Sequence, residues 1–281
     1  MKKKYEESNI QAIAEAIREK TGTDNTYDTS EMASGVGEVF EAGKKAEYDA
    51  FWDRIQQNGN RDFYEYGFYY WDSEYIRPKH KVVTSNRSRN LCVFAYNRAL
   101  KKIEKEYFDL SNYIPSNDSV NGNYYLFYSC EALEEIEDIG IQAGGYYYAF
   151  NSCPKLKRIE VMRCREDGIY TVPFTACYDL TDITIEGVIG TNFPIPFSPL
   201  SPASLKSIIK HLKNYSGTDK EFAYTVTFKS SAFNELMSAG FDDDDYEWFE
   251  NTFGYSKEYA IENSLSWHDM CSGLCWNIVL A

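Results

Sequence analysis

The segment AFNSCPKLKRIEV, Ala149 to Val161, places a phenylalanine, a cysteine, a leucine and an isoleucine at intervals of three residues. The same frame, Phe-x-x-(Asn or Cys)-x-x-Leu-x-x-Ile, also begins at Phe94, Phe127 and Phe174. The four phenylalanines are 33, 23 and 24 residues apart. Four matches of this length predict a repeated structural unit, in which the cysteine of the quoted segment occupies one recurring position.

A period of about 20–29 residues with this frame is typical of leucine-rich repeats. In the last two copies the frame continues to Val161 and Ile185 with a period of two, which predicts a short β-strand. We therefore expect one strand per repeat in a parallel sheet, with the frame residues buried in a core shared between repeats. The predicted core ladder consists of Phe94, Asn97, Leu100, Ile103, Phe127, Cys130, Leu133, Ile136, Phe150, Cys153, Leu156, Ile159, Phe174, Cys177, Leu180 and Ile183.

The remaining chain predicts different structure on either side of the repeats. Residues 1–60 have helical patterns, beginning with a capping box at Ser8 and Gln11. Residues 61–200 form the repeat region, and residues 201–281 a C-terminal cap. The cap begins with a helix that has Ser201 as N-cap and Pro202 at its first position. We further expect a strand in AYTVTF, a helix in KSSAFNELMSAG and a final strand in GLCWNIVLA.

The predicted fold class is thus α/β, a short irregular leucine-rich-repeat solenoid with N-terminal helices and a C-terminal α/β cap. The chain has 43 acidic and 29 basic side chains, so its net charge of −14 disfavours nucleic acid and anionic lipid as partners. No apolar run approaches the roughly 18 residues of a membrane span. Lys2–Lys4 precede an amphipathic rather than an apolar segment, so we expect no secretory signal and a cytoplasmic location in the producing cell.

The cysteines at the shared repeat position, Cys130, Cys153 and Cys177, are candidates for either core or reactive thiols. Because Asn97 fills the same position in the first copy, we predict buried thiols that donate weak hydrogen bonds to turn carbonyls. Reactive nucleophiles are the alternative. Seven cysteines in a chain of this size indicate reduced thiols.

Metal binding and catalysis have weak support in the sequence. His268, Cys271 and Cys275 supply three of the four ligands that zinc prefers, so we expect no metal and no cofactor. The run Asp242–Asp245 does not continue as a calcium loop and predicts a solvated acidic turn. The histidines, His80, His211 and His268, lie on segments assigned to different places, and no nucleotide-binding or hydrolase motif occurs. An enzyme, for example a hydrolase, is the least favoured class.

Tyrosine is abundant, with 24 copies, and is concentrated in the segments Asn123–Cys130 and Gly144–Phe150. Alternate residues in each segment should point into the core and into solvent. Tyr124, Tyr146 and Tyr148 are therefore candidates for a surface that binds a protein or a glycan. The alternative is that half of these rings fill the core and the others belong to an ordinary surface.

The frames FNSCPKLKRIEV and FTACYDLTDITI resemble the BspA-like leucine-rich-repeat family. The segments Ile13–Val36, Phe51–Arg61 and Ser198–Lys220 are similar to cytosolic or prophage-encoded members from gut Firmicutes. The stretches 111–123 and 242–263 depart from that pattern.

The resemblance implies a non-catalytic protein-binding or structural role, with a prophage origin and association with a phage tail or a host surface. A bacterial surface adhesin that binds glycans is the alternative. We expect the N-terminal helices to be an attachment element through which copies of the chain form a homo-oligomer, and the ligand itself is not indicated.

Overall fold

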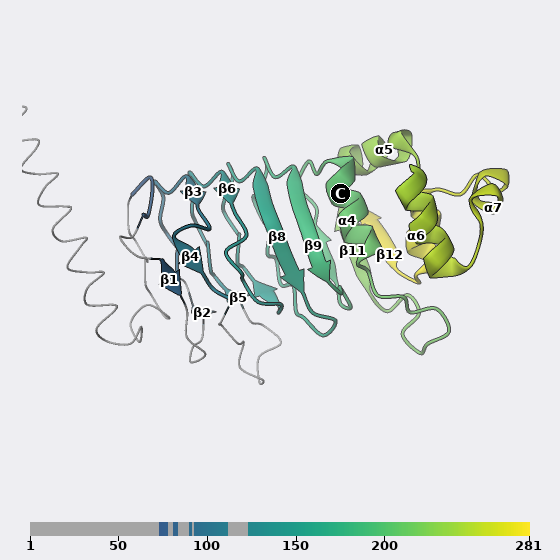
Figure 1. Ribbon diagram of the computed structural model, residues 1–281, viewed down its shortest axis with the longest axis horizontal. Coiled ribbons are helices and arrows are strands. Elements are labelled where there is room, and N and C mark those ends of the chain that lie inside the picture. Colours follow the sequence, from purple (N-terminus) through teal and green to yellow (C-terminus); the bar gives the residue numbers. More distant parts are fainter. Residues whose placement is uncertain (1–72, 78–80, 84–89, 92, 112–122) are drawn as a thin grey trace, which may run out of the picture. The chain divides into compact units, whose positions relative to one another are not determined.

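The repeated phenylalanine frame forms a stack of turns in the computed structural model (Figure 1). The structure describes residues 73–77, 81–83, 90–91, 93–111 and 123–281. The chain divides into two units, 1–59 and 60–281. The predicted N-terminal helices, His80 and Cys92 lie outside the described residues, so the predictions made for them stay predictions.

The turns are joined by short parallel strands that form separate ladders. The longest ladder has the order β3-β6-β8-β9 and a second has the order β2-β5-β7. The first comprises β3 (Lys102–Ile103), β6 (Glu135–Ile136), β8 (Arg158–Cys164) and β9 (Asp182–Gly187). The others are β2 (Asn90–Leu91), β5 (Asn123–Tyr124) and β7 (Tyr146–Tyr147), and the pair β1 (Val82–Val83) and β4 (Phe108–Asp109).

The expectation of one strand per repeat was wrong, because the turns that begin at β5 and β7 each contribute a second strand, β6 and β8. The reason is that neighbouring turns also form backbone hydrogen bonds to each other at the phenylalanine that begins the frame and at the residues before it. The N–H groups of Phe94, Phe127 and Phe150 donate to the carbonyls of Leu126, Ala149 and Pro173 in the next turn. Backbone pairing therefore continues around the turn instead of being limited to one sheet.

The predicted ladder lies in the core, and every one of its sixteen residues is at most 3% exposed. Ile103, Ile136, Ile159 and Ile183 are in direct register across the long sheet. The four phenylalanine rings stack at centroid distances of 5.1, 5.7 and 5.3 Å, with interplanar angles of 4°, 11° and 6°. This packing buries apolar area that a single turn could not cover.

Each described turn contains left-handed backbone two residues after its phenylalanine, and the turns of Phe127, Phe150 and Phe174 also contain it two residues before. Two residues before it stand Tyr125, Tyr148 and Val172, with φ values of 48°, 52° and 42°. Two residues after it stand Tyr96, Ser129, Ser152 and Ala176, with φ between 57° and 63°. Side chains other than glycine are strained in this conformation, so the turn shape is imposed by the stacking.

The C-terminal part confirms the predicted order of helices and strands, with additions. The predicted elements are α4 (Pro202–Lys210), β11 (Thr225–Phe228), α5 (Ser230–Ala239) and β12 (Asn277–Leu280). The additional ones are β10 (Phe193–Ile195), α6 (Asp243–Phe253), α7 (Lys257–Glu262) and α8 (Trp267–Gly273). Strands β10, β11 and β12 form a parallel sheet in that order. Strand β10 precedes residue 201, at which the cap was predicted to begin. None of the helices in the described part of the chain is long and apolar enough to cross a membrane.

Helix α4 covers the edge of the long sheet, next to β9 (Figure 1). Its N-cap is Ser201, whose side chain accepts from the N–H of Ser204, and Pro202 occupies the first turn as predicted. Ser204 and Ser207 accept hydrogen bonds from the N–H groups of Ile183 and Ile185, both at 2.9 Å. Two hydroxyls one helical turn apart thus replace a further strand at this edge.

The run Asp242–Asp245 was predicted to be a solvated turn, and this prediction was wrong. The run forms the N-cap and the first turn of α6. Asp242 and Asp245 form a reciprocal capping box, and Asp245 is completely buried. Lys210 lies 2.7 Å from one Asp245 oxygen, and Lys206 contacts the other oxygen as well as Asp242. The acidic side chains therefore connect α6 to α4 instead of facing water together.

Candidate functional site

Six tyrosines from three successive turns form a contiguous array, here called the tyrosine cluster. Its members are Tyr96, Tyr124, Tyr125, Tyr128, Tyr147 and Tyr148, all of them half-buried. Tyr124 and Tyr147 are register partners on β5 and β7, with ring centroids 5.2 Å apart. The parallel ladder therefore places like residues of successive turns beside each other.

The rings contact each other mainly through faces and edges within the cluster. Tyr125 and Tyr148 stack at 5.5 Å with an interplanar angle of 6°. Tyr128 meets both Tyr125 and Tyr96 edge-on, at 5.2 Å in each case. Stacking covers ring faces, so the cluster offers ring edges and hydroxyl groups to solvent.

Two of the three tyrosines predicted to lie on the surface do so, and the prediction for the third was wrong. Tyr124 and Tyr148 belong to the cluster, but Tyr146 is 1% exposed. The Tyr146 hydroxyl donates to the carbonyl of Arg163 at 2.9 Å, and its ring stacks on Phe150. Burial raises the pKa of Tyr146 well above its ordinary value.

The prediction that alternate residues of these segments point into the core and into solvent failed because Tyr125 and Tyr148 have left-handed backbone. That conformation breaks the period of two, so Tyr147 and Tyr148 are both half-exposed. Of the four missed cluster residues, Tyr96, Tyr125, Tyr128 and Tyr147, alignment of the repeats could have identified Tyr125 and Tyr147. Tyr124 and Tyr147 stand three residues before the repeat phenylalanine, and Tyr125 and Tyr148 two residues before it.

The hydroxyl groups of the cluster differ from those of the buried tyrosines. Tyr146, Tyr170 and Tyr215 donate to backbone carbonyls at 2.6 to 3.1 Å. The hydroxyls of Tyr124, Tyr128 and Tyr148, in contrast, have no hydrogen-bond partner among the described residues. They are available to a ligand, and each can both donate and accept.

The pKa of Tyr125 is raised by burial and then by the nearby Tyr147, Tyr148 and Tyr128. Crowding of hydroxyls disfavours a phenolate among them. The Tyr125 side chain therefore stays protonated at physiological pH.

The repeat cysteines have the geometry of structural thiols. Cys130, Cys153 and Cys177 donate to the carbonyls of the preceding-turn phenylalanines, Phe94, Phe127 and Phe150, each at 3.0 Å. Burial raises the pKa of Cys153 to about 12. A protonated thiol without solvent access is a poor nucleophile, so these residues do not form a reactive site.

The metal candidate is not assembled in the structure. His268 is exposed on α8, whereas Cys271 is fully buried on the same helix. Burial raises the pKa of Cys271 to about 12. Within the described residues, no group of three or more His, Cys, Asp or Glu side chains is placed to hold a metal ion. His211 contacts the carbonyl of Ser207 through Nδ1, within α4 and its cap.

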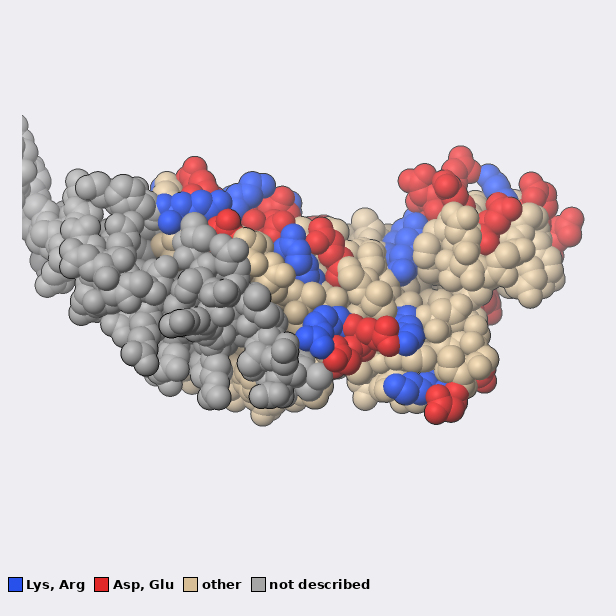
Figure 2. Space-filling model, turned by 60° about the horizontal axis from the view of Figure 1, so that its bottom comes forward, with Lys and Arg blue, Asp and Glu red and all other residues tan. Residues whose placement is uncertain are grey.

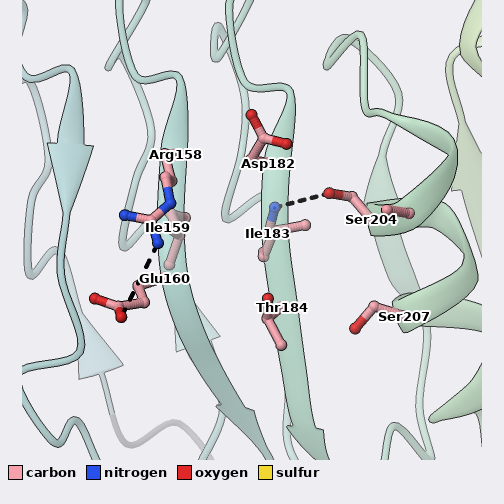
Figure 3. Close-up of a pocket in the computed structure, with 9 residues that line it drawn as sticks. Arg158, Ile159, Glu160, Asp182, Ile183, Thr184, Ser204 and Ser207 are labelled. Atoms are coloured by element: carbon pink, nitrogen blue, oxygen red, sulfur yellow. Dashed lines mark hydrogen bonds and ion pairs between the residues drawn. The ribbon is translucent and has the colours of Figure 1, made fainter.

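A groove of about 250 Å³ lies between the exposed face of β8 and β9 and helix α4 (Figure 3). Several of its polar groups are engaged with the protein. Arg158 contacts Glu135 at 2.5 Å and Glu160 at 4.0 Å, and Glu160 accepts from the N–H of Asp138 at 3.0 Å. Ser204 binds the β9 backbone, so the groove is the seam of the sheet cap rather than a set of convergent catalytic groups.

Comparisons of the chain with protein-family models, with curated proteins and with solved structures found no match.

Proposed function

We propose that the chain is a non-catalytic binding or structural protein, built as a short irregular leucine-rich-repeat solenoid of the BspA-like kind. The parallel register of the frame isoleucines and the continuous phenylalanine stack support this architecture. The terminal helix α4 supports it further, since a stack of repeats needs a different structure at its end.

The tyrosine cluster is the binding surface of this proposal, and it is the observation on which the function rests. It combines six half-buried rings with three hydroxyls, those of Tyr124, Tyr128 and Tyr148, that have no hydrogen-bond partner among the described residues. Tyrosine gives large contact area at a low cost in side-chain entropy. The stacked turns hold the rings in place before a ligand arrives, which reduces the cost of ordering on binding.

A protein is a better ligand than a glycan for this cluster. Sugars stack on open aromatic faces, but Tyr125 and Tyr148 cover each other's faces at 5.5 Å. Ring edges and hydroxyls instead suit the peptide groups and apolar side chains of a protein partner. The glycan-binding adhesin is kept as the outcome that would replace this proposal.

A non-catalytic role is supported by the state of the reactive groups. The described repeat thiols are buried and protonated, and in the α4 groove Arg158 pairs with Glu135 and Ser204 accepts from the β9 backbone. The prophage origin, the tail or host-surface association and the homo-oligomer formed through residues 1–60 rest on the family resemblance alone. Tail genes beside the gene for this chain would support that origin, and a neighbourhood of host metabolic genes would contradict it.

The experiment is selection of a random peptide library on the immobilised full chain, in parallel with a glycan array. Selected peptides should bind wild type at least 10-fold more tightly than the variant Tyr124→Phe/Tyr128→Phe/Tyr148→Phe. This variant keeps the rings and removes three hydroxyls, each worth about 1 kcal/mol.

The matched control is Tyr178→Phe, at an exposed tyrosine outside the cluster, which should bind like wild type. Equal binding by the triple variant would contradict the assignment of the surface. A glycan that binds wild type but not the triple variant would establish the adhesin alternative.

A further inference from the structure

Helix α7 and the residues between α6 and α7 expose apolar side chains that the core does not use. Tyr255, Tyr259 and Ile261 are 49%, 42% and 56% exposed. The rings of Tyr255 and Tyr259 stack at 4.5 Å with an interplanar angle of 18°. Two half-exposed rings and an exposed aliphatic side chain thus lie within seven residues, a concentration that marks an interaction surface more than scattered exposure does.

Acidic side chains predominate in the segment that carries these apolar side chains. Residues 243–262 contain seven acidic side chains and one lysine. Asp245 is used by Lys206 and Lys210, and Asp243 by Lys257 at 2.7 Å. The five others form no ion pair within the described part of the chain, and we call them, together with Tyr255, Tyr259 and Ile261, the α6–α7 surface: Asp244, Glu247, Glu250, Glu258 and Glu262.

The spacing of these acids aligns them on the helices. Asp244, Glu247 and Glu250 are three residues apart on α6, and Glu258 and Glu262 are four apart on α7. Asp243 and Lys257 join the beginnings of the two helices. Figure 2 shows acidic side chains gathered at this end of the molecule, with few basic ones among them.

The repeat region shows what the chain does with charge where no partner is needed. Lys102, Glu135, Arg158 and Asp182 are in register across four strands, with alternating sign. Lys102 and Arg158 pair with Glu135, at 3.1 and 2.5 Å. In Figure 2 blue and red side chains are accordingly interspersed over this part. The sheet face is self-neutralised, whereas the α6–α7 surface is not.

We propose that the α6–α7 surface binds an arginine-containing, partly apolar segment of a partner protein. A guanidinium group can stack on a tyrosine ring and pair with a carboxylate at the same time. Aliphatic side chains of the partner would cover Ile261. This surface shares no residue with the tyrosine cluster, so it gives the protein a second site whose test is independent of the proposed function.

The test is titration of the full-length protein with fluorescent 12-residue peptides, followed by anisotropy at two salt concentrations. The probes alternate arginine with leucine, arginine with serine, or glutamate with leucine. We expect the arginine–leucine peptide to bind at least 10-fold more tightly than the arginine–serine peptide, and the glutamate–leucine peptide not to bind. Equal binding of the first two would reduce the effect to net charge and overturn the proposal.

Variants locate the site. Tyr255→Ser/Tyr259→Ser/Ile261→Ser should weaken binding of the arginine–leucine peptide at least 10-fold at an unchanged melting temperature. Glu247→Gln/Glu250→Gln/Glu258→Gln, which keeps the apolar side chains, should weaken it and reduce its salt dependence. The charge-matched control Asp179→Asn/Glu221→Gln/Glu235→Gln should bind like wild type. The same loss in control and test variants would overturn the assignment.

Sedimentation of the protein without peptide distinguishes another occupant. Self-association that disappears in the Tyr255→Ser/Tyr259→Ser/Ile261→Ser variant would make a second copy of the chain the occupant and would overturn the proposal of a cationic partner.

Discussion

At the scale of single residues, Cys153 connects two turns through its thiol. The thiol donates to the Phe127 carbonyl and fills core space, so Cys153→Ala should lower the free energy of unfolding by about 1–2 kcal/mol. Because burial raises the thiol pKa from 9.0 to about 12, the folded state favours the protonated thiol. This contribution is complete below about pH 9 and is lost as the pH rises toward 12.

Urea unfolding at pH 8, 9, 10 and 10.5 under reducing conditions measures both effects. Above pH 9 the free energy of unfolding should fall less steeply in Cys153→Ala than in wild type, by about 1.4 kcal/mol per pH unit. Identical slopes would mean that the Cys153 thiol titrates in the folded protein as it does in the unfolded chain.

Ala176 tests the strain of the left-handed positions. Its φ of 63° costs about 1–2 kcal/mol for a side chain with a Cβ, whereas glycine adopts it freely. The greater backbone entropy of glycine in the unfolded chain offsets part of this gain. Ala176→Gly should therefore raise the free energy of unfolding by about 0.5–1 kcal/mol. The control Ala203→Gly, at an exposed position within α4, should lower it by about 0.5–1 kcal/mol. Destabilisation by both changes in thermal unfolding would contradict the strain.

The sequence predicted the thiol position but not the strained backbone. The repeated cysteine column was visible in the spacing, because packing requires a small side chain at that point of every turn. The left-handed column contains Tyr96, Ser129, Ser152 and Ala176, and none of these is a residue that signals a positive φ. Stacking between turns imposes the conformation, so local sequence does not reveal it.

At the scale of elements, the edge of β9 depends on α4. Ser204→Ala would leave the Ile183 N–H without its acceptor in a buried place and should lower the free energy of unfolding by about 1–3 kcal/mol. Ser238→Ala, which removes an exposed hydroxyl from α5, should change it by less than about 0.5 kcal/mol. Chemical denaturation of both variants measures the difference, and equal effects would mean that the hydroxyl does not cap the sheet.

The contact between α4 and α6 depends on Asp245. Asp245→Asn leaves Lys206 and Lys210 without their shared buried carboxylate and should lower the free energy of unfolding by about 3 kcal/mol. Asp244→Asn, one residue earlier and exposed, should change it by less than about 1 kcal/mol. A small effect at Asp245 in denaturant titration would contradict the role assigned to this ion pair.

The elements that the sequence predicted are those with clear ends. Helix α4 has serine at its N-cap and proline in its first turn. Strand β11 alternates buried and partly exposed residues, and β12 follows a turn. Helix α6 was missed because its capping box uses Asp242 and Asp245 in place of the usual serine or threonine and glutamate. Four consecutive aspartates indicated solvation, and only the lysines of α4 explain why one of them is buried.

At the scale of the whole molecule, the repeat period predicted the parallel stacking and its core but not its second ladder. The frame describes the residues that point inward, and it contains no information on how turns bond before the phenylalanine. The tyrosine cluster arises from that second ladder, which explains why alternation along each segment placed Tyr146 in the wrong environment. When the repeats are aligned, the positions two and three residues before the phenylalanine predict which tyrosine rings contact each other.

The central claim is that the tyrosine cluster recruits a protein partner. The most direct measurement is quantitative mass spectrometry of proteins captured by three immobilised chains: wild type, Tyr124→Phe/Tyr128→Phe/Tyr148→Phe, and the control Tyr178→Phe. We expect at least one protein that wild type and the control capture equally and that the triple variant loses by about 10-fold or more, as expected for three lost hydrogen bonds. Identical captured proteins on all three chains would contradict it.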